Sequence, residues 1–310
     1  MVVDRKRGLA LALVAGVAAL SGCASTPAKH DWRAIEGPAL VIYTDGNLES
    51  ARSYYDDLER FRAAMRWYTS LTKTPVKAKT RIMLFKSSTD ALPYLIKKEV
   101  GAWASVTATG NLAVTKLEGK EKQSDRQTLK RDLVKLWLDD ARVRTPTWYK
   151  EGLAELVSAF VVGEDSVTVG GLPPIDLAKY PELIADAKKG HAAAALLSEE
   201  PVRYELEDRA RVWLTVHYLM VANKERQADL RNYFHAWSQG TPSADAFKAA
   251  FGQDPAEFFR LEVSRYGTRQ LPAHQFGLAG TVPEPNVREA SRDEIEKLTA
   301  EVERAVGRLR

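Results

Sequence analysis

The sequence contains a single cysteine, Cys23, in 310 residues. A disulfide within the chain is therefore excluded, and a body without cysteine suits an oxidising compartment. None of the five histidines has a second histidine three or four residues away, so no helix presents two imidazoles to a metal ion. The chain also lacks a Gly-rich phosphate loop and a Gly-x-Ser-x-Gly nucleophile elbow. We expect each histidine to be a satisfied core or surface side chain, with His217 in the core.

The chain has little net charge once its first segment is discounted. The formal net charge is +4, but Asp4 and the run Arg5-Lys6-Arg7 contribute +2 of it, so residues 23–310 carry +2. A charge this small gives no electrostatic footprint for nucleic acid, so no nucleic-acid partner is expected.

The N-terminal residues have the pattern of a bacterial lipoprotein signal peptide. The basic run 5–7 precedes an apolar stretch, Leu9 to Leu20, that is too short to span a bilayer. Leu20-Ser21-Gly22-Cys23 follows and resembles a lipobox, which predicts removal of residues 1–22 and acylation of Cys23 with chains such as palmitate. An ordinary secretory signal with a chance cysteine is the alternative. Ala24, by resemblance to bacterial sorting rules, favours lipid anchoring in the outer membrane, facing the periplasm.

Hydrophobic periodicity predicts an α+β fold, a small N-terminal mixed β-sheet with helices followed by a helical bundle. The expected strands and helices of the first part are strand 39–43, helix 48–68, strand 81–85, helix 90–98 and a hairpin of 103–107 with 112–115. After the hairpin we expect only helices, at 125–140, 146–160, 175–189, 204–223, 225–237, 243–250 and 255–265. The expected organisation is a signal peptide 1–22, a tether 23–37, one domain 38–266 with lobes 38–120 and 121–266, a linker 267–290 and a C-terminal amphipathic helix 291–310.

The C-terminal helix has a narrow apolar seam behind a capping box. Ser291 and Glu294 form the box, and the seam residues recur at steps of three and four: Ile295, Leu298, Val302, Ala305 and Leu309. Such a helix can lie on the body of its own chain or extend into solvent. It can also bind a partner or a second copy through Ile295, Leu298, Val302 and Leu309.

Two charged segments lie close together in the second half. Arg131-Asp132-Leu133-Val134-Lys135 is one face of an amphipathic helix, and read alone it is a solvated surface. Trp148-Tyr149-Lys150-Glu151-Gly152-Leu153-Ala154-Glu155 follows, with Thr145-Pro146 as a helix start. Gly152 costs about 1 kcal/mol against alanine inside a helix. A close approach of another helix would explain its presence.

Together these segments resemble the metal-binding helices of gluzincin-like zinc peptidases, in a degenerate form found as a domain of unknown function in bacterial lipoproteins. That family has His-Glu-x-x-His on one helix and often Trp-x-x-Glu-Gly-x-Ala-Glu on the next. Here Arg131 and Lys135 stand at the two histidine positions, Asp132 at the general base and Glu151 at the third ligand. The resemblance spans roughly residues 39–266, more weakly through 212–219 and 252–255, and implies a zincin-like metallopeptidase architecture.

The substituted positions predict loss of zinc catalysis. A guanidinium has no lone pair to donate and an ammonium at neutral pH has none either, so Arg131 and Lys135 are not ligands. Without zinc there is no acidified water for Asp132 to deprotonate. We therefore expect no catalytic residue at Arg131, Asp132, Lys135 or Glu151, no metal and no cofactor. Arg131 or Lys135 is expected to pair with Glu151, because a partly buried carboxylate without a cation is costly.

The leading functional hypothesis is a lipid-anchored binding or scaffolding protein for a peptide or an envelope protein. Its groove would lie between the hairpin edge and the helix of Arg131, where an edge strand holds an extended peptide by main-chain hydrogen bonds. The residues expected to line it are Trp103, Ser105, Thr107, Glu151 and Glu155. The second hypothesis is a hydrolase that uses Asp132, Glu151 or Glu155 without zinc or with a hard cation such as magnesium or calcium, although the adjacent cations oppose a dication. The third is an envelope assembly component that acts through the C-terminal helix.

Overall fold

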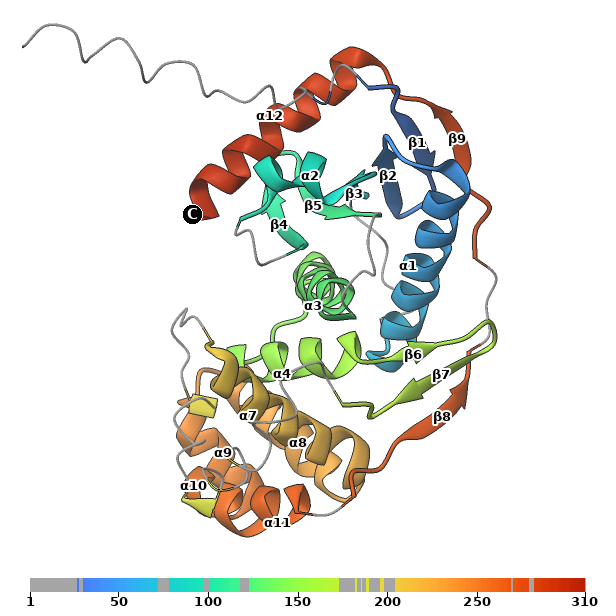
Figure 1. Cartoon of the computed structure of the whole chain (residues 1–310). Helices are drawn as coiled ribbons and strands as arrows, with labels where there is room; N and C mark the ends of the chain where they lie inside the picture. Colours follow the sequence, from blue (N-terminus) through green and yellow to red (C-terminus); the bar gives the residue numbers. More distant parts are fainter. Residues whose placement is uncertain are drawn as a thin grey trace, which may run out of the picture.

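The protein has a mixed α/β fold in which a six-stranded sheet and a helical lobe lie on either side of one helix, α3 (Figure 1). The computed structural model describes residues 27, 30–71, 78–96, 101–117, 123–172, 204–268, 270–278 and 282–309, and a few positions between 182 and 197. Cys23 and the signal peptide lie outside these residues, and so does nearly all of the expected helix 175–189. No helix in the described ranges is long and apolar enough to cross a membrane.

The large sheet has the strand order β4-β5-β3-β2-β1-β9. Its strands are β1 (Arg33–Glu36), β2 (Leu40–Thr44), β3 (Thr80–Phe85), β4 (Trp103–Thr107), β5 (Gly110–Lys116) and β9 (Asn286–Glu289). The three central strands β2, β3 and β5 run parallel, whereas β4, β1 and β9 are antiparallel to their neighbours. The central strands are almost continuously buried, as strands covered on both faces must be.

Helices cover both faces of this sheet. On one face, Ile42, Ile82 and Leu84 form a core with side chains of α1 (Leu48–Tyr68) and α3 (Gln123–Asp140). On the other, residues such as Met83 pack against α12 (Arg292–Leu309), beside the short helix α2 (Ser88–Ala91) and the 3-10 turn Leu92–Tyr94. The alternation of side chains along each strand produces these two separate cores.

The helical lobe packs around a set of large aromatic side chains. It contains α4 (Thr147–Ser158), α7 (Leu206–His217) continued by a π-helical turn (Tyr218–Ala222), α8 (Arg226–Ser238), α9 (Ser243–Phe251), α10 (Pro255–Phe258), a second π-helical turn (Phe259–Val263) and α11 (Ser264–Gly267). The indole Nε1 of Trp148 donates to the Tyr233 hydroxyl at 2.9 Å, and that hydroxyl lies 2.8 Å from Ser243 Oγ. Hydrogen bonding of these buried polar groups lets α4, α8 and α9 share one core.

The second half is not purely helical, contrary to the sequence-based expectation. Strands β6 (Val161–Val162), β7 (Ser166–Val169) and β8 (His274–Gly277) form a small antiparallel sheet. β8 comes from the segment expected to be a linker. These strands have two to four residues, too few to give a recognisable hydrophobic alternation.

The segments expected as tether and linker also contribute to the large sheet. β1 lies within the expected tether and pairs with β2, and β9, from the expected linker, pairs with β1. The chain therefore returns to its N-terminal strand just before α12 begins.

The seam of α12 is buried within the chain. Ile295, Leu298 and Val302 are part of the core on the sheet, while Leu309 is 45% exposed. The helix therefore lies on the body of its own chain, which is one of the arrangements expected from the sequence. The apolar side chains expected to drive self-association are thus largely covered by the chain's own sheet.

Candidate functional site

Helix α3 separates the sheet from the helical lobe and turns a third face toward α4 (Figure 1). Leu129 and Leu133 pack under the sheet, whereas Val134 and Leu138 belong to the core of the helical lobe. The remaining face carries the charged segment 131–135, which ion pairs connect to α4. The expected juxtaposition of the two motifs is therefore present.

Lys135 occupies the position from which a cation can neutralise Glu151. Its Nζ lies 3.3 Å from Glu151 Oε1 and 3.4 Å from Oε2, and 3.7 Å from Asp132 Oδ1. The Lys135 side chain is 27% exposed and those of Glu151 and Asp132 are each 15% exposed. The predicted pairing of Glu151 with one of the two cations is confirmed, and Lys135 is the partner.

Arg131 binds the other two carboxylates of the cluster. Its Nε and Nη2 donate to Asp132 Oδ1 at 3.0 and 2.9 Å, and its Nη1 lies 3.6 Å from Glu155 Oε1. Burial opposes the charge of this guanidinium. The negative charges of Asp132, Glu155 and Glu151 outweigh that cost and raise the pKa of Arg131.

A third cation, Arg209 on α7, completes the cluster and was not expected from the sequence. Its Nε donates to Glu155 Oε1 at 2.5 Å, and the Glu155 side chain is only 2% exposed. Arg209 lies in the charged run Glu205 to Arg211, which has the composition of a solvated helix face. The only available signal was indirect, since a buried glutamate on α4 needs a cation from whichever helix packs against it.

Gly152 explains how α7 comes close enough to supply that cation. A Cβ at this position would lie 2.5 Å from Val212 O and 2.6 Å from Val216 Cγ2. The backbones of α4 and α7 therefore approach at a point where only glycine fits. The predicted close helix-helix contact at Gly152 is confirmed.

The cluster of Arg131, Asp132, Lys135, Glu151, Glu155 and Arg209, here called the ion-pair cluster, does not fit a zinc ion. Three of its members are cations without a donor lone pair, and all three carboxylates are engaged by them. No group of three His, Cys, Asp or Glu side chains in the described part of the chain could hold a metal. Each of the three carboxylates therefore has a cation as its nearest charged partner.

The residues expected to line a groove do not all share one face. Trp103 is buried on the α12 side of the sheet, where its Nε1 donates to Tyr94 O at 2.8 Å. Thr107 donates to Glu301 of α12 and to Gly110 O. Ser105 lies between them on the same face, because alternate side chains of a strand point the same way. The groove hypothesis therefore needs correction: Trp103, Ser105 and Thr107 are directed toward α12, away from the ion-pair cluster, and Glu155 is too buried to contact a ligand.

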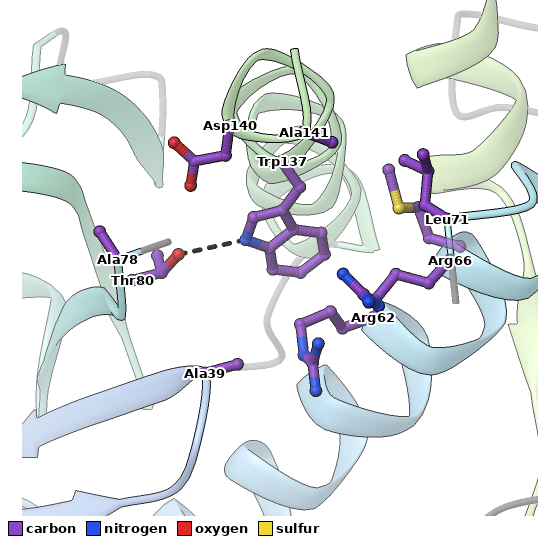
Figure 2. Close-up of a pocket in the computed structure, with 10 residues that line it drawn as sticks. Ala39, Arg62, Arg66, Leu71, Ala78, Thr80, Trp137, Asp140 and Ala141 are labelled. Atoms are coloured by element: carbon purple, nitrogen blue, oxygen red, sulfur yellow. Dashed lines mark hydrogen bonds between the residues drawn. The ribbon is translucent and has the colours of Figure 1, made fainter. Parts of the chain in front are cut away.

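A small cavity lies at the other end of α3 (Figure 2). Arg62 and Arg66 extend into it from α1, and Trp137 from α3 donates its Nε1 to Thr80 Oγ1 at 3.1 Å. Arg62 also donates to the buried Glu59 at 2.7 Å. The cavity measures about 30 Å³, which is enough for water but far below the volume of a ligand site.

His217 is a satisfied core histidine, as expected. Its Nε2 lies 3.1 Å from Gly170 O, and because a carbonyl only accepts, Nε2 carries the proton. Nδ1 then accepts from the Tyr266 hydroxyl at 2.5 Å. Burial lowers the pKa of His217 below its ordinary value of 6.5.

The buried imidazole predicts a loss of stability in mild acid. Since the pKa of His217 is lower in the folded than in the unfolded chain, its contribution is fully present above pH 6.5 and is lost as the pH falls below that value. We expect urea unfolding midpoints to decrease from about pH 7.5 to about pH 5.5. His217→Gln should reduce this dependence, whereas His235→Gln, at an exposed position, should leave it unchanged. An NMR titration giving the His217 ring a pKa above 6.5 in the folded protein would contradict the prediction without requiring a variant to fold.

No protein-family model matches the sequence, and no curated protein matches it either.

Proposed function

We propose that this protein is a lipid-anchored peptide-binding protein built on a zincin-like fold that has lost its catalytic metal. The observation that carries the proposal is the ion pair of Lys135 with Glu151 at 3.3 Å. It joins the two positions at which the resemblance places a histidine ligand and the third ligand. A resident ammonium there would replace the charge of the metal and keep Glu151 compensated.

The arrangement of elements around the cluster supports the zincin-like part of the proposal. α3 lies between the sheet and the helical lobe, and α4 follows it with the Trp148–Glu155 motif (Figure 1). The strand at the sheet edge, β4, is antiparallel to β5 and packs near α3. Peptidases with this architecture bind an extended substrate along such an edge strand, and that mode of binding needs no metal.

The edge of β4 has the groups for strand addition. Among the described strands, β4 has a neighbour on one side only. Thr107 and Gly110 flank a two-residue turn and pair with each other, so the N–H and C=O of Val106 point away from β5. Val106 is 57% exposed. We therefore assign peptide binding to the main chain of β4. The side chains of the bound peptide would then be selected on the face of the sheet that faces α3.

The test removes one outward N–H without changing the sheet. The full chain is titrated with a library of extended peptides, and the tightest binder is then measured against Val106→Pro and Val106→Thr. Proline at an edge position removes the donor and blocks strand pairing, so we expect at least about tenfold weaker binding, the loss of roughly one or two hydrogen bonds. Threonine keeps the N–H and a β-branched side chain, so binding should be retained.

Two results would reject the proposal. One is that no peptide in the library binds and that the hydrogen-exchange rates of the β4 amides are the same with and without peptide. The other is equal binding by the proline and threonine variants. Lipid anchoring through Cys23, outer-membrane placement and a periplasmic partner remain part of the proposal and rest on the lipobox and on Ala24.

A further inference from the structure

A second and larger pocket lies on the opposite side of α4 from the ion-pair cluster. It measures about 500 Å³ and lies between the end of α1, the connection from α3 to α4, α4 itself and α8. Pockets for small organic ligands have volumes of about 300–1,000 Å³ and apolar walls with a few polar groups. The apolar wall includes Leu138, Tyr149, Leu153, Met220, Leu230 and Phe234.

Two side chains that line this pocket have a buried hydroxyl group with no hydrogen-bond partner within the described ranges. The two hydroxyl oxygens are Tyr68 Oη and Thr145 Oγ1. Burial raises the pKa of Tyr68, so its phenol remains protonated and is available as a donor. Buried polar groups in folded proteins are nearly always paired, and a pair of unpartnered hydroxyls in one pocket indicates a bound acceptor.

The charge at the rim indicates the kind of head group. Arg231 of α8 lines the pocket and is exposed, and no described residue forms an ion pair with it. The neighbouring arginine of the same helix, Arg226, is by contrast held by Asp229 and Glu262. Arg231 therefore offers an uncompensated guanidinium next to an apolar cavity that also has two hydroxyl donors. A carboxylate is the group that matches all three.

We propose that this pocket binds a free single-chain amphiphile with an anionic head, of the fatty-acid class. The apolar chain would lie against Leu153, Leu230 and Phe234. The carboxylate would lie toward Arg231 at the rim. The site is independent of the ion-pair cluster, because Tyr149 and Leu153 project from the face of α4 opposite to Glu151. Failure of either proposal leaves the other intact.

Calorimetric titration of the full chain with dodecanoate tests the ligand class. We expect saturable binding of one molecule per chain. Hexanoate should bind at least about tenfold more weakly, because it buries fewer methylene groups, and dodecylamine should also bind more weakly, because its charge has the wrong sign for Arg231. Equal binding of dodecanoate and dodecylamine would overturn the assignment of an anionic head. Binding only to vesicles of phosphatidylglycerol, with none to free dodecanoate, would overturn the assignment of a free ligand.

Variants of the three polar residues locate the site. Tyr68→Phe with Thr145→Val removes hydroxyls that have no described partner, so the melting temperature should stay the same or rise while dodecanoate binds about five- to tenfold more weakly. Arg231→Gln should weaken binding to a similar extent. Arg304→Gln, an exposed arginine on α12, is the matched control and should bind as the original protein does. Unchanged affinity in both the hydroxyl double variant and Arg231→Gln would overturn the proposal.

Discussion

Replacing Arg131 by methionine is expected to lower the free energy of unfolding by about 3 kcal/mol, the usual cost of removing one partner of a buried ion pair. The Arg131 side chain is 14% exposed and it is the cation shared by Asp132 and Glu155. Methionine has a similar apolar length, so it fills the space of the side chain but leaves Asp132 without its closest cation. Chemical denaturation of the two proteins at one pH measures the difference directly.

Comparing variants of a more buried and a less buried cation of the cluster separates the effect of burial on stability from the effect of charge. Lys135→Met should cost less, about 1–2 kcal/mol, because Lys135 and Glu151 retain contact with water. Arg304→Met, which removes an exposed charge of α12, should leave stability unchanged within error. If Arg131→Met and Lys135→Met were both as neutral as this control, the cations would not be compensating the carboxylates. The hypothesis that Arg131 and Lys135 supply the positive charge of a lost metal ion would then be rejected.

The pairing of Glu151 with Arg131 or Lys135 could be predicted from the sequence because these residues lie in segments with a recognisable spacing, whereas the choice of Lys135 depends on the packing of α3 against α4. Helix periodicity places Arg131 and Lys135 on one face, and the Trp148–Glu155 motif fixes which glutamate faces them. Arg209 could not be predicted in the same way. It is far along the chain, and its position over Glu155 depends on how α7 slides along α4, which is a property of the packed helices.

The missed strands have a different cause. β8 has four residues, all on the exposed side of the chain, and β1 and β9 also have four residues each, so none of them carries a hydrophobic pattern long enough to detect. Their pairing is between residues more than one hundred positions apart in β7 with β8 and more than two hundred apart in β1 with β9. Local sequence gives no information about such pairs.

The error in the expected groove follows from the same limit. The alternation along β4 was predictable, and it places Trp103, Ser105 and Thr107 together. Which face of the sheet they occupy depends on α12, whose seam could equally have served a partner. Once α12 packs on the sheet, Glu301 binds Arg81 at 2.7 Å and also accepts from Thr107 and Thr109. Burial opposes ionisation of Glu301, but these contacts lower its pKa to about 2. The hairpin end is thereby committed to α12, and the peptide binding proposed above is assigned to the main-chain edge of β4 instead.

Gly152→Ala is expected to destabilise the protein by about 3 kcal/mol, the upper part of the range for overpacking a well-packed core. The added methyl group would lie 2.5 Å from the carbonyl oxygen of Val212 and 2.6 Å from Val216 Cγ2. The first of these contacts is to backbone, so α7 must move away from α4 to accommodate it. Alanine also has the better helix propensity, by about 1 kcal/mol, and the steric cost must exceed this gain.

Gly307→Ala in α12 is the matched control. It is a helical glycine where an added Cβ meets nothing within 4 Å, so stability should rise by up to about 1 kcal/mol. Truncating the side chain at the clash, in Gly152→Ala with Val216→Ala, should restore only part of the loss, because the contact with Val212 O remains. Full restoration by this double variant would mean that the two backbones are not in contact. The position of Arg209 over Glu155 would then need another explanation, since the close approach at Gly152 is what places α7 there.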